Sequence, residues 1–264
     1  MLKSIAQILV IAPLLATTPA ILASEQAVSP AILPFPTSFP LPSLKTIMER
    51  TVERAKLEEQ NDRGFQQHYT FRRIRVNEEW NGPDSAKKRE EKISQHTPKI
   101  GVAAPIVIKS VPSTPNPPAT STKSLSKKDF AINEELLARF QFTMLGREVL
   151  NGRPALVLDF KPAGKNFPIH SFKDHFINKA AGRLWVDEDD FVLAKTDIRL
   201  TEGVSILGGL LGAVKGLSYH FDRERTPDGF WFTKKLKWHV DAREFLVNKT
   251  MEHQEEKLDV RKVN

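Results

Sequence analysis

Two clusters of potential metal ligands stand out in the sequence. Asp187-Glu188-Asp189-Asp190 could bind a hard cation through carboxylate oxygens, but this run lacks the glycine and the spaced ligands of a calcium loop. His170, Asp174 and His175 form the second cluster, in which the spacing of the histidines suits neither one helical face nor one strand face. We predict a solvated hairpin turn and a polar loop at these positions, with a metal site at either cluster as the alternative.

Residues for covalent catalysis are not apparent from the sequence. The chain has no cysteine, which excludes a cysteine nucleophile, a disulfide scaffold, and zinc or iron–sulfur sites with cysteine ligands. It contains no GxSxG, P-loop or GxGxxG motif, and spacing indicates no acid–base pair. We therefore expect no catalytic residues, no cofactor and no enzymatic activity, with a hydrolase as the least favoured function.

The net charge of the 264-residue chain is +7, from 39 lysines and arginines against 32 acidic residues. This excess is confined to two segments. Lys3 lies in the first 23 residues, and residues 99–128 contain five lysines and no acidic residue, so the rest of the chain is close to neutral. A nucleic-acid-binding domain carries its basic residues on the folded surface that docks. The charge therefore does not predict a nucleic-acid partner.

The first 23 residues have the pattern of an export signal. Lys3 gives a positive start, Ile5–Ala16 is apolar, and small residues follow up to Ala23. The apolar stretch is shorter than the roughly 20 residues that a membrane-spanning helix needs, and a buried N-terminal helix is the alternative. We predict that residues 1–23 are a signal peptide. The mature protein is then soluble in the periplasm, an oxidising compartment where unpaired thiols are a hazard.

Residues 24–42 are rich in proline and predict an extended leader, after which the pattern becomes helical. Ser43 is a suitable N-cap for a helix over Leu44–Glu59, which should end near Asn61–Gly64. The apolar residues of this helix share one face: Leu44, Ile47, Met48, Val52 and Ala55. We predict that residues 43–264 form one domain in which this amphipathic helix lies on the strands that follow.

From Gly64 onward the apolar period changes to that of β-strands. Strands are predicted at 65–80, 87–95, 140–149, 155–161, 182–186, 191–200, 217–225, 230–241 and 245–260, with a short helix at 133–137. Asn151-Gly152 and Thr226-Pro227-Asp228-Gly229 are hairpin signals. Consecutive strands with short turns predict an antiparallel meander, and their alternation predicts one apolar face and one wet face.

Residues 99–128 interrupt the domain. They are rich in proline, serine and lysine and predict a flexible insert, in which the apolar run 106–108 is too isolated for a core strand. A second unusual segment, Gly203–Gly216, is rich in glycine and leucine and fits neither helix nor strand well. It is either a strand end with a wide turn, or a pliable apolar lip at the mouth of a cavity. The lip residues would be Ile206, Leu207, Leu210 and Leu211.

Several segments resemble the LolA/LolB-like superfamily of periplasmic lipoprotein carriers. They are FQFTMLG at 140–146, NGRPA at 151–155 running into LDFKP at 158–162, and GRLWVD at 182–187. The resemblance implies an α+β fold, namely a curved antiparallel incomplete β-barrel with an amphipathic helix covering its concave face. In that family the cavity beneath the helix receives acyl chains, and in relatives the same fold serves envelope sensing.

The resemblance also implies which residues would line such a cavity. Arg183 and Arg199 are candidates for the arginine on which carriers of this family depend. The helix stripe is expected near Phe142, Leu158 and Trp238. The candidate lining residues are Ile47, Met48, Phe140, Phe142, Leu156, Leu158, Leu184, Phe232, Leu236 and Trp238.

We therefore expect a periplasmic binding or carrier protein for acyl chains of lipids or lipoproteins in envelope trafficking. Exposing an acyl chain to water costs about 0.8 kcal/mol per methylene, so carrying one requires an apolar cavity. The expected partners are an acylated lipid or lipoprotein and an envelope membrane protein. The alternative is an envelope-stress sensor that binds a membrane partner protein through the same fold.

Overall fold

The computed structural model describes most of the predicted domain. The described residues are 40–82, 85–98, 106–110, 132–164, 167–169, 172–206, 212–244 and 247–263. Leu41–Asn264 form one compact unit. The predicted signal peptide and nearly all of the leader lie outside the described residues. None of the helices in the described ranges is long and apolar enough to cross a membrane.

Two helices begin the domain. α1 (Leu44–Lys56) starts at the predicted N-cap Ser43, whose hydroxyl accepts a hydrogen bond of 3.1 Å from the backbone N–H of Thr46. The chain turns at Leu57 and continues as α2 (Glu58–His68). The prediction that the helix ends near Asn61–Gly64 and that a strand includes Phe65 is therefore wrong.

Contacts that are distant in the sequence explain the extra helix. A Cβ atom on Gly64 would lie 2.4 Å from Cε1 of Phe230, so this glycine allows a close approach and is not a helix end. Phe65 is buried between Tyr69, Phe71 and Phe232, and its ring stacks on that of Phe232 at 4.8 Å. The helical period up to His68 is thus fixed by packing against strands far along the chain.

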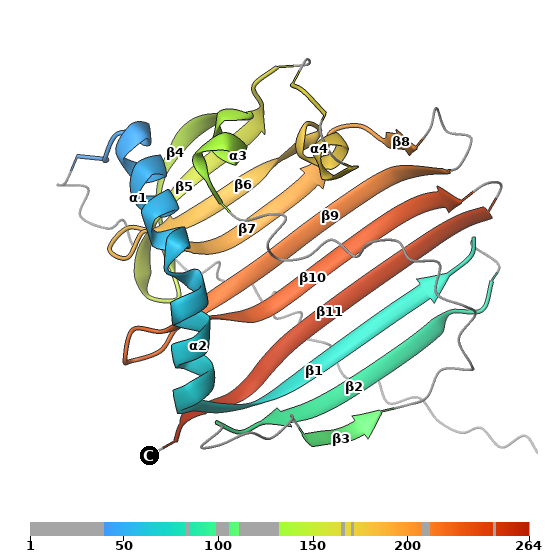
Figure 1. The fold of residues 1–264 in the computed structure, drawn as a ribbon, viewed down its shortest axis with the longest axis horizontal. Helices are drawn as coiled ribbons and strands as arrows, with labels where there is room; N and C mark the ends of the chain where they lie inside the picture. The colour runs from blue at the N-terminus through green and yellow to red at the C-terminus, as the bar shows by residue number, and fades with distance from the viewer. Residues whose placement is uncertain are drawn as a thin grey trace, which may run out of the picture. The chain divides into compact units, whose positions relative to one another are not determined.

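The strands form one antiparallel sheet in the order β3-β2-β1-β11-β10-β9-β7-β6-β5-β4, with β8 paired to β9 (Figure 1). Since β3 and β4 are its edges, the sheet does not close, and the predicted fold class, an α+β protein with an incomplete antiparallel barrel, is confirmed. The strands are β1 (Tyr69–Trp80), β2 (Lys88–His96), β3 (Ile106–Ser110), β4 (Phe140–Leu150), β5 (Arg153–Pro162), β6 (Ala180–Asp187), β7 (Leu193–Leu200), β8 (Val204–Ile206), β9 (Gly212–Arg225), β10 (Trp231–Glu244) and β11 (Val247–Lys262).

The hairpins β4–β5, β6–β7 and β9–β10 form where the turn residues predict them. Asn151 and Gly152 both have positive φ, at 52° and 77°, as a tight hairpin turn requires. α3 (Glu134–Ala138) is the predicted short helix, and the side chain of Asn133 caps it. α4 (Phe172–Ile177) is a short helix that the sequence pattern does not indicate.

One part of the predicted insert belongs to the sheet. Residues 106–110 pair with β2 as the edge strand β3, so the prediction of a loop does not hold for these residues. The apolar run is isolated in sequence but gains backbone hydrogen bonds from a neighbouring strand. The rest of the insert, 99–105 and 111–128, lies outside the described residues.

Candidate functional site

The strand register places the candidate residues on one face of the sheet. Residues directly opposite one another on paired strands point to the same face. One row across the sheet contains Leu158, Leu184, Thr196, Phe221, Leu236, Glu255 and Arg75. The next row contains Phe142, Phe160, Gly182, Ile198, Tyr219, Trp238, His253 and Asn77. Both rows change from apolar to polar between β10 and β11.

We call the half-buried apolar side chains of this face the apolar floor. They share the face onto which α1 and α2 pack, and many of them are predicted lining residues. The apolar floor consists of Phe140, Phe142, Leu184, Ile198, Tyr219, Phe221, Leu236 and Trp238.

α1 covers one end of this face, as Figure 1 shows. Ile47 has no exposed surface, and it packs in one cluster with Leu156, Leu158, Val186 and Phe191. Met48 contacts the same cluster. The predicted lining residues under α1 are therefore in contact with one another, and side chains fill the space between helix and sheet at this end.

The other predicted lining residues lie elsewhere on the face. The ring of Phe142 packs against Phe140 and Phe160, and Trp238 stacks on His253 at 5.3 Å. The cluster beneath the α1 stripe contains Leu158, as expected, whereas Phe142 and Trp238 are not among its members. Phe232 belongs to the cluster beneath α2.

Beyond β10 the same face carries charges. We call Arg73, Arg75, His253, Glu255 and Lys257 the charged margin. Arg75 donates two hydrogen bonds to Oε2 of Glu255, at 3.2 and 3.0 Å. Lys257 donates to the carbonyl oxygen of Thr233 at 2.8 Å, and its Nζ lies 3.5 Å from Oε1 of Glu255. These side chains are largely buried, since Lys257 is 15% exposed and Glu255 is 18% exposed.

Burial and neighbouring charges both shift the pKa values of side chains in the charged margin. Burial opposes ionisation of Glu255, but Lys257, Arg75 and Arg73 outweigh it and lower the pKa of this carboxyl. Burial lowers the pKa of Lys257, although Glu255 favours its charged form. Burial together with Arg75 also lowers the pKa of His253, so this ring is neutral at pH 7. The floor therefore ends at a neutral aromatic pair, Trp238 on His253, followed by an ionised cluster.

The opposite face of the sheet carries both arginine candidates, together with an apolar cluster of Ala155, Val157 and Trp185. Arg183 forms an ion pair with Asp159, at 2.7 Å between Nε and Oδ1. The register places Arg199 opposite Ser218 and Ala181, on the same outer face as Arg183. Neither arginine lies on the helix-covered face, so neither points toward the apolar floor.

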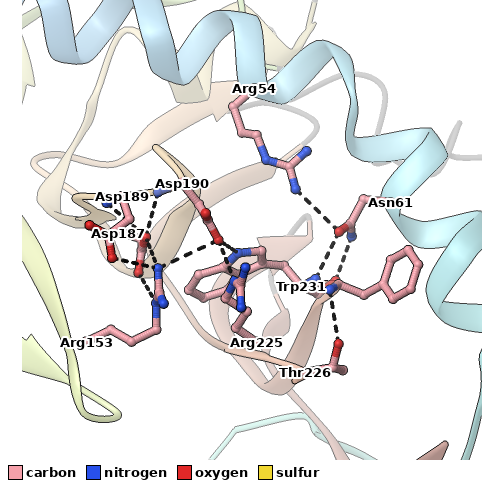
Figure 2. A network of polar contacts seen from close by, with 10 residues as sticks. Arg54, Asn61, Arg153, Asp187, Asp189, Asp190, Arg225, Thr226 and Trp231 are labelled. Carbon is pink, nitrogen blue, oxygen red and sulfur yellow. Dashed lines mark hydrogen bonds and ion pairs between the residues drawn. The ribbon is translucent and has the colours of Figure 1, made fainter. Parts of the chain in front are cut away.

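The acidic run 187–190 forms part of a partly buried polar network (Figure 2). Asp187 is only 1% exposed, and both of its oxygens accept hydrogen bonds from Arg153, at 2.6 and 2.8 Å. Asp190 accepts from Arg225 and from the indole N–H of Trp231, at 2.6 and 2.8 Å. The prediction of a hairpin turn is confirmed, but these two acids are ion-paired and not simply solvated.

The second candidate metal cluster is also engaged in an ion pair. Asp174 and Arg139 are both buried, with 3.2 Å between Oδ1 and Nη1. His170 lies outside the described residues. Within the ranges that the structure describes, no group of three histidine, cysteine or acidic side chains is placed to hold a metal ion. Among the lip candidates, Ile206 ends β8, and Leu207, Leu210 and Leu211 lie outside the described residues.

Asn61 connects α2 to the start of β10. Its side-chain amide donates to the carbonyl oxygen of Trp231 at 2.7 Å and accepts from the N–H of Trp231 at 2.9 Å, as Figure 2 shows. We predict that Asn61→Ala lowers the free energy of unfolding by about 2–4 kcal/mol, because it removes two hydrogen bonds to buried backbone groups and leaves the carbonyl of Trp231 with only the 3.5 Å contact to Arg223. Urea unfolding measures this loss. Gln60→Ala, at an exposed position of the same helix, is the control, and an equal loss in both variants would contradict the prediction.

Two histidines on the outer face lie between carboxylates. His220 contacts Asp197 and Asp222, at 2.5 and 2.8 Å, and His239 contacts Glu252 and Asp241, at 3.0 and 2.9 Å. Burial alone would lower the pKa of each ring, but the hydrogen bonds to the carboxylates outweigh it and raise both pKa values. Each protonated ring therefore stabilises the folded state.

This stabilisation depends on pH. It is fully present below the unfolded pKa of about 6.5 and is lost as the pH rises through the higher folded pKa. We predict that the double variant His220→Gln/His239→Gln is less stable than the parent at pH 6, and that the difference shrinks by pH 9. Urea unfolding at both pH values tests this, and a difference that does not change with pH would contradict it.

Sequence reasoning missed the charged margin. The sequence does not indicate that Arg73, Glu255 and Lys257 lie together, because β1 and β11 are far apart in the chain. One signal was available: the segment that forms β11 has few apolar residues at alternating positions. Such a strand in the interior of a sheet predicts a polar stripe across the otherwise apolar face.

The described residues define an α+β protein with an open antiparallel sheet, whose helix-covered face joins an apolar floor to a charged margin. No protein-family model and no curated protein matches the sequence. Among solved structures, the chain is similar to a putative outer-membrane lipoprotein-sorting protein domain from Vibrio parahaemolyticus. The two share 15% identity over 81% of this chain and 93% of that chain, with a TM-score of 0.31.

Two further solved structures are similar to the chain. A LolA superfamily protein from Nitrosomonas europaea shares 11% identity over 85% of this chain and 95% of that chain, with a TM-score of 0.32. A chain of the MucA/MucB complex from Pseudomonas aeruginosa shares 9% identity over 80% of this chain and 99% of that chain, with a TM-score of 0.21. The LolA superfamily, which the sequence motifs resemble, is thus represented among the similar structures.

Proposed function

We propose that the protein is a periplasmic binding or carrier protein for acyl chains of lipids or lipoproteins in envelope trafficking, and that it performs no covalent chemistry. The observation that carries the proposal is the apolar floor. Its eight side chains are only half-buried, although they share the face onto which α1 and α2 pack. A surface of this kind is stabilised when a further apolar group covers it.

The two faces of the sheet differ in polarity, and the helix-covered face offers the apolar floor to an acyl chain. The outer face carries ion pairs such as Arg183–Asp159, which an acyl chain lying there would have to desolvate. On the floor each buried methylene contributes about 0.8 kcal/mol, which favours long chains over short ones. The export signal expected at residues 1–23 supports a location where such chains pass between membranes.

Extraction of the purified protein with organic solvent, followed by mass spectrometry, tests the proposal. Protein exported with its own signal sequence should release acylated molecules in near-stoichiometric amounts. Leu236→Asp places a charge on the floor and should abolish this release. Lys237→Asp, at the neighbouring position on the outer face, is the matched control and should retain it. A wild-type protein that releases no acylated molecule, and binds no apolar dye, would contradict the proposal.

A second candidate function, a sensor that binds a membrane partner protein, is favoured by the β4 edge. Among the described strands β4 is an edge, so one row of its backbone groups has no strand partner there, and Leu145 and Val149 are exposed, at 47% and 50%. A photoreactive residue at Val149 should then crosslink one envelope membrane protein stoichiometrically. The same residue at the exposed position Lys237 is the control. Equal labelling at both positions would contradict this second function.

A further inference from the structure

Arg73 is a cation without a paired acid on the helix-covered face. The register places it opposite Lys257 on β11 and two residues from Phe71, which packs against α2. Arg73 is partly buried, and no direct hydrogen bond or ion pair joins it to another described residue, although Glu255 is close enough to interact with its charge. Arg75, two residues further along the same strand, is held by Glu255. Arg73 is therefore the member of the charged margin that is free to bind a ligand.

The charges around Arg73 leave a net positive charge. Arg73, Arg75 and Lys257 are cations, and Glu255 is the acid between them. Asp62 on α2 adds a second negative charge that acts on Lys257. Asp62 also interacts with a further group, so it does not cancel the positive charge that favours an anionic ligand here. Glu255 repels any such ligand, and it repels a doubly charged phosphate more strongly than a singly charged carboxylate.

The margin and the floor are close enough to hold the two ends of one molecule. Strand β1 is two strands from β10 in the sheet order. Neighbouring strands are about 4.8 Å apart, so Arg73 lies on the order of 10 Å from strand β10, which carries Leu236. That separation is short compared with an extended acyl chain of sixteen carbons. A chain lying across β10, β9 and β7 would cover Leu236, Phe221 and Leu184.

We propose that the charged margin binds the carboxylate of a long-chain fatty acid through Arg73, while the acyl chain lies on the apolar floor. The planar fork of a guanidinium matches the two oxygens of a carboxylate. This inference rests on the proposed acyl-binding function and names the class of head group. It predicts that affinity depends on the head group as well as on the length of the chain.

Displacement of an environment-sensitive apolar dye by hexadecanoate, hexadecanol and hexadecyl phosphate tests the proposal. The wild-type protein should bind hexadecanoate about tenfold more tightly than hexadecanol, since a charge-assisted hydrogen bond adds to equal chain burial. Arg73→Gln should bring this ratio close to one without changing the affinity for hexadecanol. Arg72→Gln removes the same charge from the adjacent residue on the outer face, where Arg72 lies 3.4 Å from Asp259, and should keep the ratio.

The outcomes separate the two proposals. If neither hexadecanol nor hexadecanoate displaces the dye, the acyl-binding function itself is wrong. If both bind equally well to the wild-type protein, acyl binding stands and the head-group assignment is overturned. Tighter binding of hexadecyl phosphate, or an equal loss in Arg72→Gln, also overturns it. Arg73→Lys keeps the charge and should retain part of the preference, which distinguishes a lost contact from a misfolded variant.

Discussion

Replacing Gly182 by alanine should destabilise the protein by more than about 4 kcal/mol, a loss that single substitutions rarely cause. A Cβ atom at this position would lie 1.9 Å from the carbonyl oxygen of Asp197 and 2.9 Å from its carbonyl carbon. Both are backbone atoms of the neighbouring strand β7, so no side-chain rotation can relieve the contact. The variant must separate β6 from β7 or remain unfolded. Circular dichroism and urea unfolding measure the result.

Gly216→Ala is the matched control for this prediction. Gly216 also lies in a central strand, but its nearest neighbour is Oδ2 of Asp241 at 3.6 Å, an ordinary contact. Alanine there should leave stability unchanged or raise it slightly, because glycine is unfavourable inside a strand. Similar losses in both variants would show that strand glycines in general, and not the close approach at Gly182, determine the effect. Gly182 also begins the GRLWVD segment on which the family resemblance rests.

Ile47→Asp should lower the free energy of unfolding by about 3–5 kcal/mol. The side chain is fully buried against Leu156 and Leu158, and an aspartate there would be an unpaired charge in an apolar cluster. We expect α1 to detach while the sheet keeps its hairpins. Limited proteolysis should then cut within residues 44–57 before it cuts the strands.

Glu53→Asp controls for the effect of aspartate on α1, since Glu53 is exposed on the same helix. It should change stability by a few tenths of a kcal/mol, the difference in helix propensity. If Ile47→Asp unfolds the sheet and the helix in one transition, α1 is an integral part of the core and not a separable cover. If it has no effect on stability, the packing of Ile47 described above is contradicted.

The parts of the fold that depend on neighbouring residues could be predicted from the sequence. Asn151 and Gly152 adopt the positive φ values of a tight turn by their own chemistry, so the β4–β5 hairpin follows from two adjacent residues. The end of the first helical region could not be predicted in this way. Asn61 is bound to Trp231, 170 residues away, and Gly64 touches Phe230. No local pattern contains these contacts.

The same distinction applies to the site. Alternation along single strands identifies Leu184, Leu236 and Trp238 as members of an apolar face, because each strand reports its own period. The charged margin depends on which strands are neighbours. Arg75 and Glu255 are separated by 180 residues and meet only because β1 pairs with β11. A sequence pattern indicates that each of these strands is polar, but not that the two polar strands are adjacent.

The position of β11 also determines the order in which the sheet can assemble. β11 pairs with β10 on one side and with β1 on the other, and Tyr69 lies opposite Lys262. During synthesis the ribosome completes β1 and β2 long before β11, so β1 can pair with β2 but lacks its second partner until β11 has emerged. Closing so long a loop costs entropy before the new contacts form, which slows folding. The strands that are made first are therefore the last to join the rest of the sheet.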